Sequence, residues 1–278
     1  MNLYGIISSI APAGAGSLPE PWTALCRLRL GAAALLCYVI NMKKLRVLPA
    51  HDVPLIVGAD ATDTVFRLRR YLVGGAASFS YDPARTMLPH AMERTQPVNW
   101  LISQVNRTRP PTGHEPNAQV VRALCRLGSE RTFVTYDAPR WCLPIRADMD
   151  IPIYSDRLVV EHGRAHLFWM QMRTTYMVPD HQHLGLLGRL FLIQAERAGY
   201  MDVGLMIADM RSVDGDERSL SLLSLADLPL ASVEAAEQAV QLIAHAYDHL
   251  IAEGFDPHAE RRARREKRPD DGPQPGLF

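Results

Sequence analysis

A β-hairpin is predicted by residues 156–173, which read DRLVVEHGRAHLFWMQMR. Its two arms, Leu158–Val160 and His166–Met172, consist largely of apolar residues, among them the β-branched and aromatic side chains that favour strands. Between the arms, Glu161-His162-Gly163-Arg164 is short, polar and contains the glycine that a tight turn favours. A hairpin of this kind provides the centre of a sheet, and the segments on either side indicate what surrounds it.

Downstream of the hairpin the pattern alternates between helix and strand. We expect a helix over His181–Ala198 that Gly199 ends, and an apolar strand over Val203–Ala208. A further strand over Leu220–Leu225 precedes a long helix over Ser232–Glu253, whose apolar residues fall on one stripe.

Upstream of the hairpin a helix and several short strands are predicted. The helix spans Asn117–Leu127 and ends at Gly128. The strands are Thr132–Tyr136, Trp141–Ile145 and Ile151–Tyr154. The order of elements therefore predicts an α/β fold with a mixed β-sheet flanked by helices.

The first half of the chain is less regular. Residues 45–57 contain short apolar runs broken by prolines, which suits edge strands or loops. Ala61–Val73 is predicted to be a helix, and Gly74-Gly75 ends it. Six prolines in residues 80–116 favour connecting structure with one short helix over Val98–Val105.

The domain boundaries follow from changes in composition. Residues 1–41 are predicted to be a poorly structured extension, and the natural start is either Met1 or Met42. The ten-residue apolar run Gly31–Ile40 is too short to span a bilayer, and no small-residue cleavage site follows it, so we expect no membrane association. Residues 42–254 are expected to form one α/β domain, and residues 255–278 a disordered basic tail.

Charge and cysteine usage narrow the function classes. The 278-residue chain has 47% hydrophobic residues, enough for a core, and 30 basic residues balance 30 acidic ones. With no net field, any contact with nucleic acid must come from a local patch. The four cysteines are scattered without metal-binding or redox spacing, which predicts reduced thiols and a cytoplasmic protein.

Four residues between positions 115 and 173 resemble the PD-(D/E)XK nuclease superfamily in type and order. Glu115 starts a helix, Asp156 lies on the first arm of the hairpin, and Gln171-Met172-Arg173 closes the second arm. That family places a glutamate, an aspartate and Glu/Gln-X-Lys in this order, followed by a helix and a further strand. The resemblance covers roughly residues 110–210 and implies a restriction-endonuclease-like core.

The resemblance also implies a chemistry. Glu115, Asp156 and the amide oxygen of Gln171 would hold Mg²⁺ for phosphodiester hydrolysis, with Arg173 as the catalytic cation. Two departures weigh against catalysis: Arg173 replaces the family's lysine, and Ser155 rather than proline precedes the aspartate. Arginine does not release its proton near neutral pH, so Arg173 suits gripping a phosphate better than activating water.

The end of the sequence resembles a short peptide motif that binds a partner protein. Gln274, Leu277 and Phe278 match the sliding-clamp-binding peptide of bacterial replication and repair proteins, with two apolar anchors and a polar rim contact. Six basic residues precede it and are candidates for DNA contacts: Arg261, Arg262, Arg264, Arg265, Lys267 and Arg268.

Three functions remain open at this stage. The first is a Mg²⁺-dependent DNA nuclease tethered to the clamp, and the second is a catalytically inactive nuclease-like adaptor that binds DNA and the clamp. The third is an interaction protein of immunity or antitoxin type with no DNA role.

The residues Asp180-His181-Gln182-His183 suggest a metal site, but Asp180 is more simply the N-cap of the helix that follows.

Overall fold

A computed structural model describes residues 45–74, 79–174, 177–211, 213–214 and 217–266. The predicted extension 1–41 and the peptide residues Gln274, Leu277 and Phe278 lie outside these ranges, as do Lys267 and Arg268. Within the described ranges, no helix is both long and apolar enough to cross a membrane.

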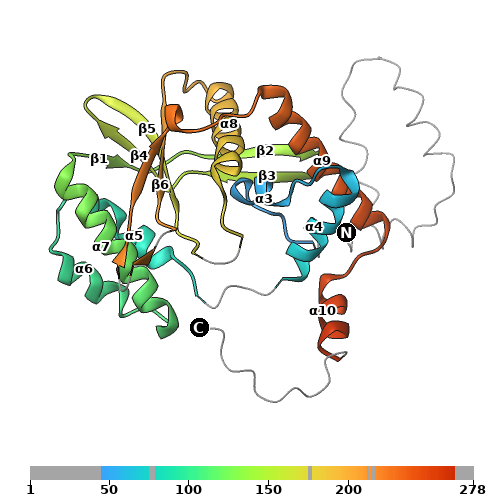
Figure 1. The fold of residues 1–278 in the computed structure, drawn as a ribbon, viewed down its shortest axis with the longest axis horizontal. Coiled ribbons are helices and arrows are strands. Elements are labelled where there is room, and N and C mark those ends of the chain that lie inside the picture. Colours follow the sequence, from blue (N-terminus) through green and yellow to red (C-terminus); the bar gives the residue numbers. More distant parts are fainter. Residues whose placement is uncertain (1–44, 75–78, 175–176, 212, 215–216, 267–278) are drawn as a thin grey trace, which may run out of the picture.

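A five-stranded mixed sheet forms the centre of the fold (Figure 1). Its strands, in spatial order, are β1 (Val134–Tyr136), β4 (Arg157–Glu161), β5 (Arg164–Gln171), β6 (Gly204–Asp209) and β9 (Ser221–Ser224). The central pair β5 and β6 is parallel, because helix α8 (His181–Arg197) connects them, and every other neighbouring pair is antiparallel. The predicted mixed sheet is thus confirmed.

The hairpin that decides the fold has the predicted turn. β4 and β5 pair with Glu161 opposite Arg164, so only two residues form the loop. His162 and Gly163 both have positive φ, 49° and 76°, which is the backbone of a type I′ turn. The turn fixes the register, and the register decides which face each side chain of β5 reaches.

Helices cover both faces of the sheet (Figure 1). Leu167 and Trp169 of β5 enter one buried cluster, while Phe168 and Met170 enter the other, as the alternation of a strand requires. The first cluster also contains residues of α3 (Val53–Ile56), α4 (Ala61–Val73), α8 and α9 (Val233–Ala252). The second contains residues of α5 (Asp82–Met92), α6 (Val98–Val105) and α7 (His114–Glu130).

Smaller elements complete the fold. The chain segment that connects β1 to β4 forms a separate hairpin of β2 (Arg140–Arg146) and β3 (Met149–Tyr154). Its Leu143, Ile151 and Ile153 enter the first cluster. The remaining elements are η3 (Ala50–Asp52), η4 (Pro111–Gly113), β7 (Val213–Asp214), β8 (Glu217–Arg218), η5 (Leu225–Asp227) and α10 (Pro257–Glu266).

Two predictions for the first half were wrong, and proline explains both. Within residues 45–57, η3 and α3 replace the expected strands or loops over residues 50–56, whereas residues 45–49 are irregular as a loop would be. Pro54 lies in the first turn of α3, where its missing N–H costs nothing. Within 80–116, helix α5 was missed because Pro83 and Pro89 suggested a loop; Pro83 lies in its first turn. The predicted short helix over Val98–Val105 is confirmed as α6.

Helix α7 continues past Gly128 instead of ending there. A Cβ atom at Gly128 would lie 2.5 Å from the carbonyl oxygen of Met92, so this glycine allows the end of α5 to approach α7 closely. Its role is therefore packing between helices, which a local sequence pattern does not distinguish from a helix stop.

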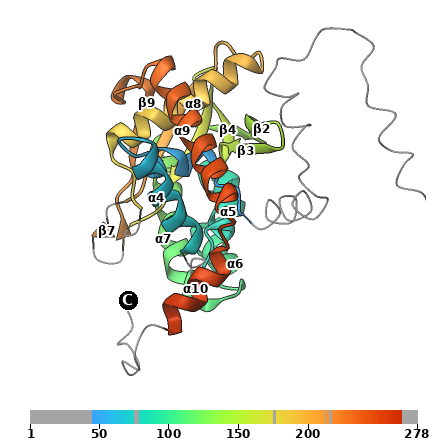
Figure 2. The ribbon, with the colours of Figure 1, turned by 90° about the vertical axis from the view of Figure 1, so that its right-hand side faces the viewer.

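The predicted disordered tail begins too early at residue 255. Phe255 is buried in the first cluster, and α10 lies below α4 in Figures 1 and 2, in contact with that helix. Arg261 donates hydrogen bonds from Nε to the Val73 carbonyl at 2.9 Å and from Nη2 to the Gly74 carbonyl at 2.7 Å. These bonds satisfy carbonyls at the end of α4 that lack helical partners, so α10 belongs to the folded domain.

Candidate functional site

Three polar residues lie at one edge of the sheet, where strands begin or end. Asp156 directly precedes β4, and Gln171 ends β5. Because β4 and β5 are antiparallel, the start of one lies beside the end of the other. Asp209 ends β6, which is parallel to β5, and therefore lies at the same edge.

Asp156 is held in a buried ion pair. Its side chain is 1% exposed, and Arg85 Nε donates to its Oδ1 at 2.6 Å. The backbone N–H of Met170 donates to its Oδ2, also at 2.6 Å. Burial raises the pKa of Asp156, and the charge of Arg85 and the Met170 N–H oppose that rise. Both carboxylate oxygens thus have partners within the protein.

A second buried carboxylate neutralises Arg173. The guanidinium Nη2 of Arg173 lies 2.6 Å from Oδ1 of Asp52, which sits on η3. The Tyr71 hydroxyl donates to the other oxygen of Asp52 at 2.8 Å. Burial, followed by the negative charge of Asp52, raises the pKa of Tyr71, so this phenol stays protonated.

His51 lies next to the second ion pair, with its Nε2 3.9 Å from Oδ1 of Asp52. Its ring contacts the rings of Tyr154 and Trp169, with centroids 5.9 and 6.0 Å apart. Burial lowers the pKa of His51 to about 4; Asp52 opposes this, while Arg173 and Arg85 add to it. His51 is therefore neutral near pH 7, and both arginines lie within electrostatic reach of it.

The three predicted metal ligands are not assembled around one point. Glu115 lies on α7 with its side chain 57% exposed, and its carboxylate pairs with Arg122 at 2.8 Å. The Gln171 amide bonds to the backbone of Arg173: Nε2 donates to the Arg173 carbonyl at 3.1 Å, and Oε1 accepts from the Arg173 N–H at 3.4 Å. Of the predicted ligands, only Asp156 and Gln171 are brought close together.

The residues present do not fit Mg²⁺. In the described part of the chain, no group of three His, Cys, Asp or Glu side chains could hold a metal ion. The buried carboxylates of Asp156 and Asp52 are each compensated by an arginine, so the edge offers no excess negative charge to a divalent cation. Asp180 is the N-cap of α8, accepting from the His183 N–H at 2.8 Å, as its alternative interpretation predicted.

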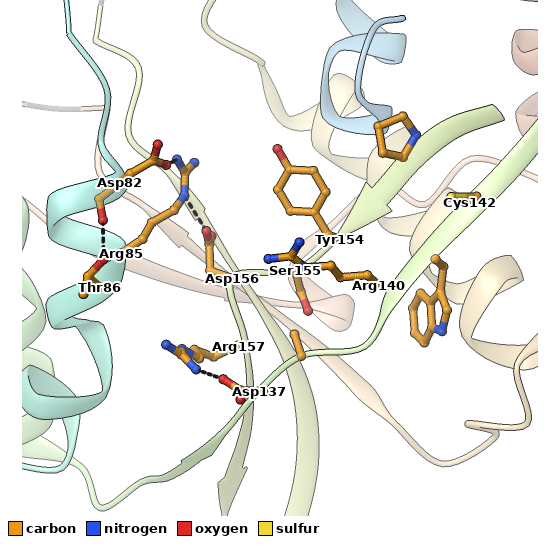
Figure 3. A pocket seen from close by; sticks show the side chains of 13 residues that line it. Asp82, Arg85, Thr86, Asp137, Arg140, Cys142, Tyr154, Ser155, Asp156 and Arg157 are labelled. Carbon is orange, nitrogen blue, oxygen red and sulfur yellow. Dashed lines mark hydrogen bonds and ion pairs between the residues drawn. The ribbon is translucent and has the colours of Figure 1, made fainter. Parts of the chain in front are cut away.

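A cavity of about 890 Å³ opens beside Asp156 (Figure 3). Asp82, Arg85 and Thr86 of α5 form one side, and the β2–β3 hairpin forms the other with Arg140, Cys142 and Tyr154. Burial raises the pKa of Tyr154, as it does that of Asp156. Shifted pKa values clustered in a cavity of ligand size mark a candidate binding site.

The basic residues predicted to contact DNA differ in role. Arg261 donates its hydrogen bonds to the carbonyls at the end of α4. Arg262 and Arg264 are exposed on α10, and Arg264 pairs with Glu260 at 2.7 Å. The side chain of Arg265 lies outside the described part of the chain, together with Lys267 and Arg268.

Sequence reasoning missed Arg85, Asp52 and His51. Arg85 is 71 residues from Asp156, and no local pattern signals a pairing over such a distance. His51 and Asp52 lie in the proline-containing segment that suggested strands or loops. The available signal was the pair of polar, ionisable residues His51 and Asp52 inside an otherwise apolar run.

No family model, curated protein or solved structure matches this chain. Its class therefore rests on the fold and the site. They define an α/β protein with a five-stranded mixed sheet, two buried carboxylates at one edge of that sheet that are each balanced by an arginine, and a cavity beside one of them, Asp156.

Proposed function

We propose that this chain is a catalytically inactive, nuclease-like adaptor that binds DNA and the bacterial sliding clamp in the cytoplasm. Its setting would be replication, repair or mobile-element biology. The observation that carries the proposal is the balance of charge at the sheet edge: Asp156 pairs with Arg85, and Asp52 pairs with Arg173. An edge of this kind can bind, and among the residues that the structure describes it does not assemble the ligand set that a metal-dependent hydrolase needs.

The order of elements supports the nuclease-like part of the proposal. Helix α7, the β4–β5 hairpin, helix α8 and the parallel strand β6 follow the order that the PD-(D/E)XK resemblance implies. The hairpin brings Asp156 beside the end of β5, because the Met170 N–H bonds to its carboxylate next to Gln171. Arg173 follows two residues later, where the family has its lysine.

The engagement of Arg173 supports inactivity. A catalytic lysine in this position would have to reach the scissile phosphate, whereas Arg173 is drawn to Asp52 at 2.6 Å. Arginine also remains protonated under all ordinary conditions, so it does not serve as a base. Phosphate binding stays compatible with the half-buried guanidinium, which is 34% exposed.

The C-terminal region supplies the proposed contacts with the clamp and DNA. Helix α10 fixes the start of the tail on α4, and Arg262 and Arg264 are exposed there. The twelve residues 267–278 that follow include the clamp-like peptide with Gln274, Leu277 and Phe278. A basic helix next to a clamp-binding peptide would add salt-dependent attraction to the DNA that the clamp encircles.

A pull-down with a bacterial sliding clamp tests the adaptor function. We expect the chain to bind the clamp, and Leu277→Ala/Phe278→Ala to abolish binding without changing the thermal melt. Arg262→Gln/Arg264→Gln should weaken duplex binding and reduce its salt dependence by roughly one unit of slope per lost phosphate contact. The matched control is Arg164→Gln/Arg197→Gln, which removes two arginines from β5 and α8.

A cleavage assay tests the inactivity. We expect supercoiled plasmid to stay intact with Mg²⁺ or Mn²⁺. Cleavage by the wild type that Asp156→Ala abolishes would establish the active nuclease instead. If neither the clamp nor DNA binds, and removal of residues 267–278 changes no interaction, the chain would be an interaction protein without a DNA role.

A further inference from the structure

One face of the β2–β3 hairpin is turned toward the cavity beside Asp156. Arg140 and Tyr154 are direct cross-strand partners, as are Cys142 and Pro152. Since side chains alternate along a strand, these four share one face of the hairpin, and all four line the cavity. Figure 3 shows Arg140 and Tyr154 on the side opposite Arg85.

The cavity holds three arginines and three aspartates, but the aspartates are poorly placed to saturate the arginines. Asp156 is fully buried and already accepts from Arg85 and the Met170 N–H. Asp82 and Asp137 are 76% and 96% exposed, so water screens their pairing with Arg85 and Arg157. These two exposed ion pairs are therefore weak, and an anion bound inside the cavity can compete with Asp82 and Asp137 for the guanidinium groups.

Unused hydrogen-bond donors remain on the cavity wall. A guanidinium has five N–H donors. Arg85 uses Nε on Asp156 and Nη1 on Asp82, and Arg157 uses Nη1 on Asp137. Within the described residues no carboxylate pairs with Arg140, although its side chain lines the cavity. Donors on three separate elements can surround an anion with several oxygens, and a phosphate group has that shape and charge.

The cavity is larger than a phosphate ion requires. About 890 Å³ lies in the range of pockets that enclose small organic ligands. Tyr154 and Pro152 present flat, apolar surfaces next to the arginines, with the exposed thiol of Cys142 beside them. A ligand with a ring attached to its phosphate would use both parts of the wall.

We propose that this cavity binds the phosphate monoester of a nucleotide, with Arg140, Arg157 and Arg85 around the phosphate and the ring along Tyr154 and Pro152. The nucleotide is either a free mononucleotide or the 5′-phosphorylated end of a DNA strand. The proposal goes beyond the adaptor function, because it requires neither the clamp nor the C-terminal tail. It can therefore succeed or fail independently of the clamp pull-down.

Calorimetric titration of the full chain tests the phosphate requirement. We expect thymidine 5′-monophosphate to bind and thymidine to give no signal. Arg140→Gln and Arg157→Gln should each weaken binding by about tenfold or more, the effect of losing a hydrogen bond between charged groups. Arg164→Gln, an exposed arginine at the hairpin turn of the central sheet, serves as the matched control and should bind like the wild type.

Alkylation of Cys142 locates the ligand. N-ethylmaleimide followed by peptide mass spectrometry reports each cysteine separately, and the exposed Cys142 lies in the cavity wall. Thymidine monophosphate should slow alkylation of Cys142 severalfold in the wild type but not in Arg140→Gln. Half-buried Cys125 on α7 is the internal reference and should react at an unchanged rate.

Two oligonucleotides distinguish the sources of the phosphate. A 5′-phosphorylated hexathymidylate that protects Cys142 better than the mononucleotide identifies a strand end, and protection by the mononucleotide alone identifies a free nucleotide. The proposal is overturned if thymidine binds as well as its monophosphate, or if the monophosphate binds without dependence on Arg140 and Arg157. It is also overturned if no phosphate-bearing probe binds at millimolar concentration.

Discussion

Removing Arg85 should destabilise the protein in a strongly pH-dependent way. Arg85→Met preserves most of the side-chain volume but leaves the Asp156 carboxylate buried without a counter-charge. Breaking a buried pair by removing one partner costs about 3–5 kcal/mol. We expect a value near the lower end, about 3 kcal/mol at pH 7, because Arg85 is 32% exposed and water partly screens the pair.

The pH dependence follows from the pKa of Asp156. Burial already raises this pKa in the wild type, and the charge and hydrogen bond of Arg85 limit the rise. Without Arg85 the pKa of Asp156 in the folded state must rise further. When the pKa of a carboxyl group is higher in the folded than in the unfolded state, the protein becomes less stable as the pH rises between the two values. The lower of them, the pKa in the unfolded state, is about 3.9. The stability gap between variant and wild type should therefore be small near pH 4 and widen toward pH 7.

Urea unfolding followed by circular dichroism between pH 4 and 8 measures this gap. The double variant Arg85→Met/Asp156→Asn should recover a large part of the loss, since a neutral amide replaces the uncompensated charge. Arg164→Met provides a surface-arginine control and should stay within about 0.5 kcal/mol of the wild type. A loss below about 1 kcal/mol, or an equal loss at every pH, would refute the reasoning about the buried pair.

Three further predictions concern groups away from the cavity floor. The free energy of unfolding of the wild type should fall by up to about 3 kcal/mol as the pH drops from 6.5 to 4, because the fold lowers the pKa of His51 to about 4. In thermal melts over this pH range, His51→Gln should lack that part of the decrease. Arg218→Met should lower the free energy of unfolding measured with urea by about 3 kcal/mol, because the fully buried guanidinium donates to the carbonyls of Met172 and Met210 and to the Tyr81 hydroxyl. A loss no larger than that of a surface arginine would contradict this reason. Gly185→Ala should lower the melting temperature by several degrees, since its Cβ would lie 2.1 Å from the Pro229 carbonyl oxygen; an unchanged melt would show that α8 can shift at no cost.

The elements that could be predicted are those with a local cause. Strong apolar patterns and glycine stops located β4, β5, α8, β6 and α9 to within a few residues. The segments with several prolines were predicted least well, because proline fits the first turn of a helix as readily as it fits a loop. Helix α5 and the η3–α3 segment were missed for this reason.

Within the candidate site, too, only the residues with a local sequence signal could be predicted. The sequence placed Asp156 and Gln171 on the two arms of one hairpin, and they lie beside each other at the sheet edge. It also grouped Glu115 with them, but the orientation of α7 leaves that side chain in solvent with Arg122. The partners of the buried carboxylates could not be predicted, since packing of α5 and η3 against the sheet brings Arg85 and Asp52 to this edge.

By itself the sequence determined the central hairpin, the position of its turn and the alternation of helix and strand around it. These features depend on backbone preferences and on contacts between near neighbours, which the order of residues states directly. Only the tertiary structure decided which charges meet, because a pairing across 71 residues depends on how separate elements pack. Whether the buried carboxylates bind a metal ion or pair with arginines is therefore decided by the packing of separate elements.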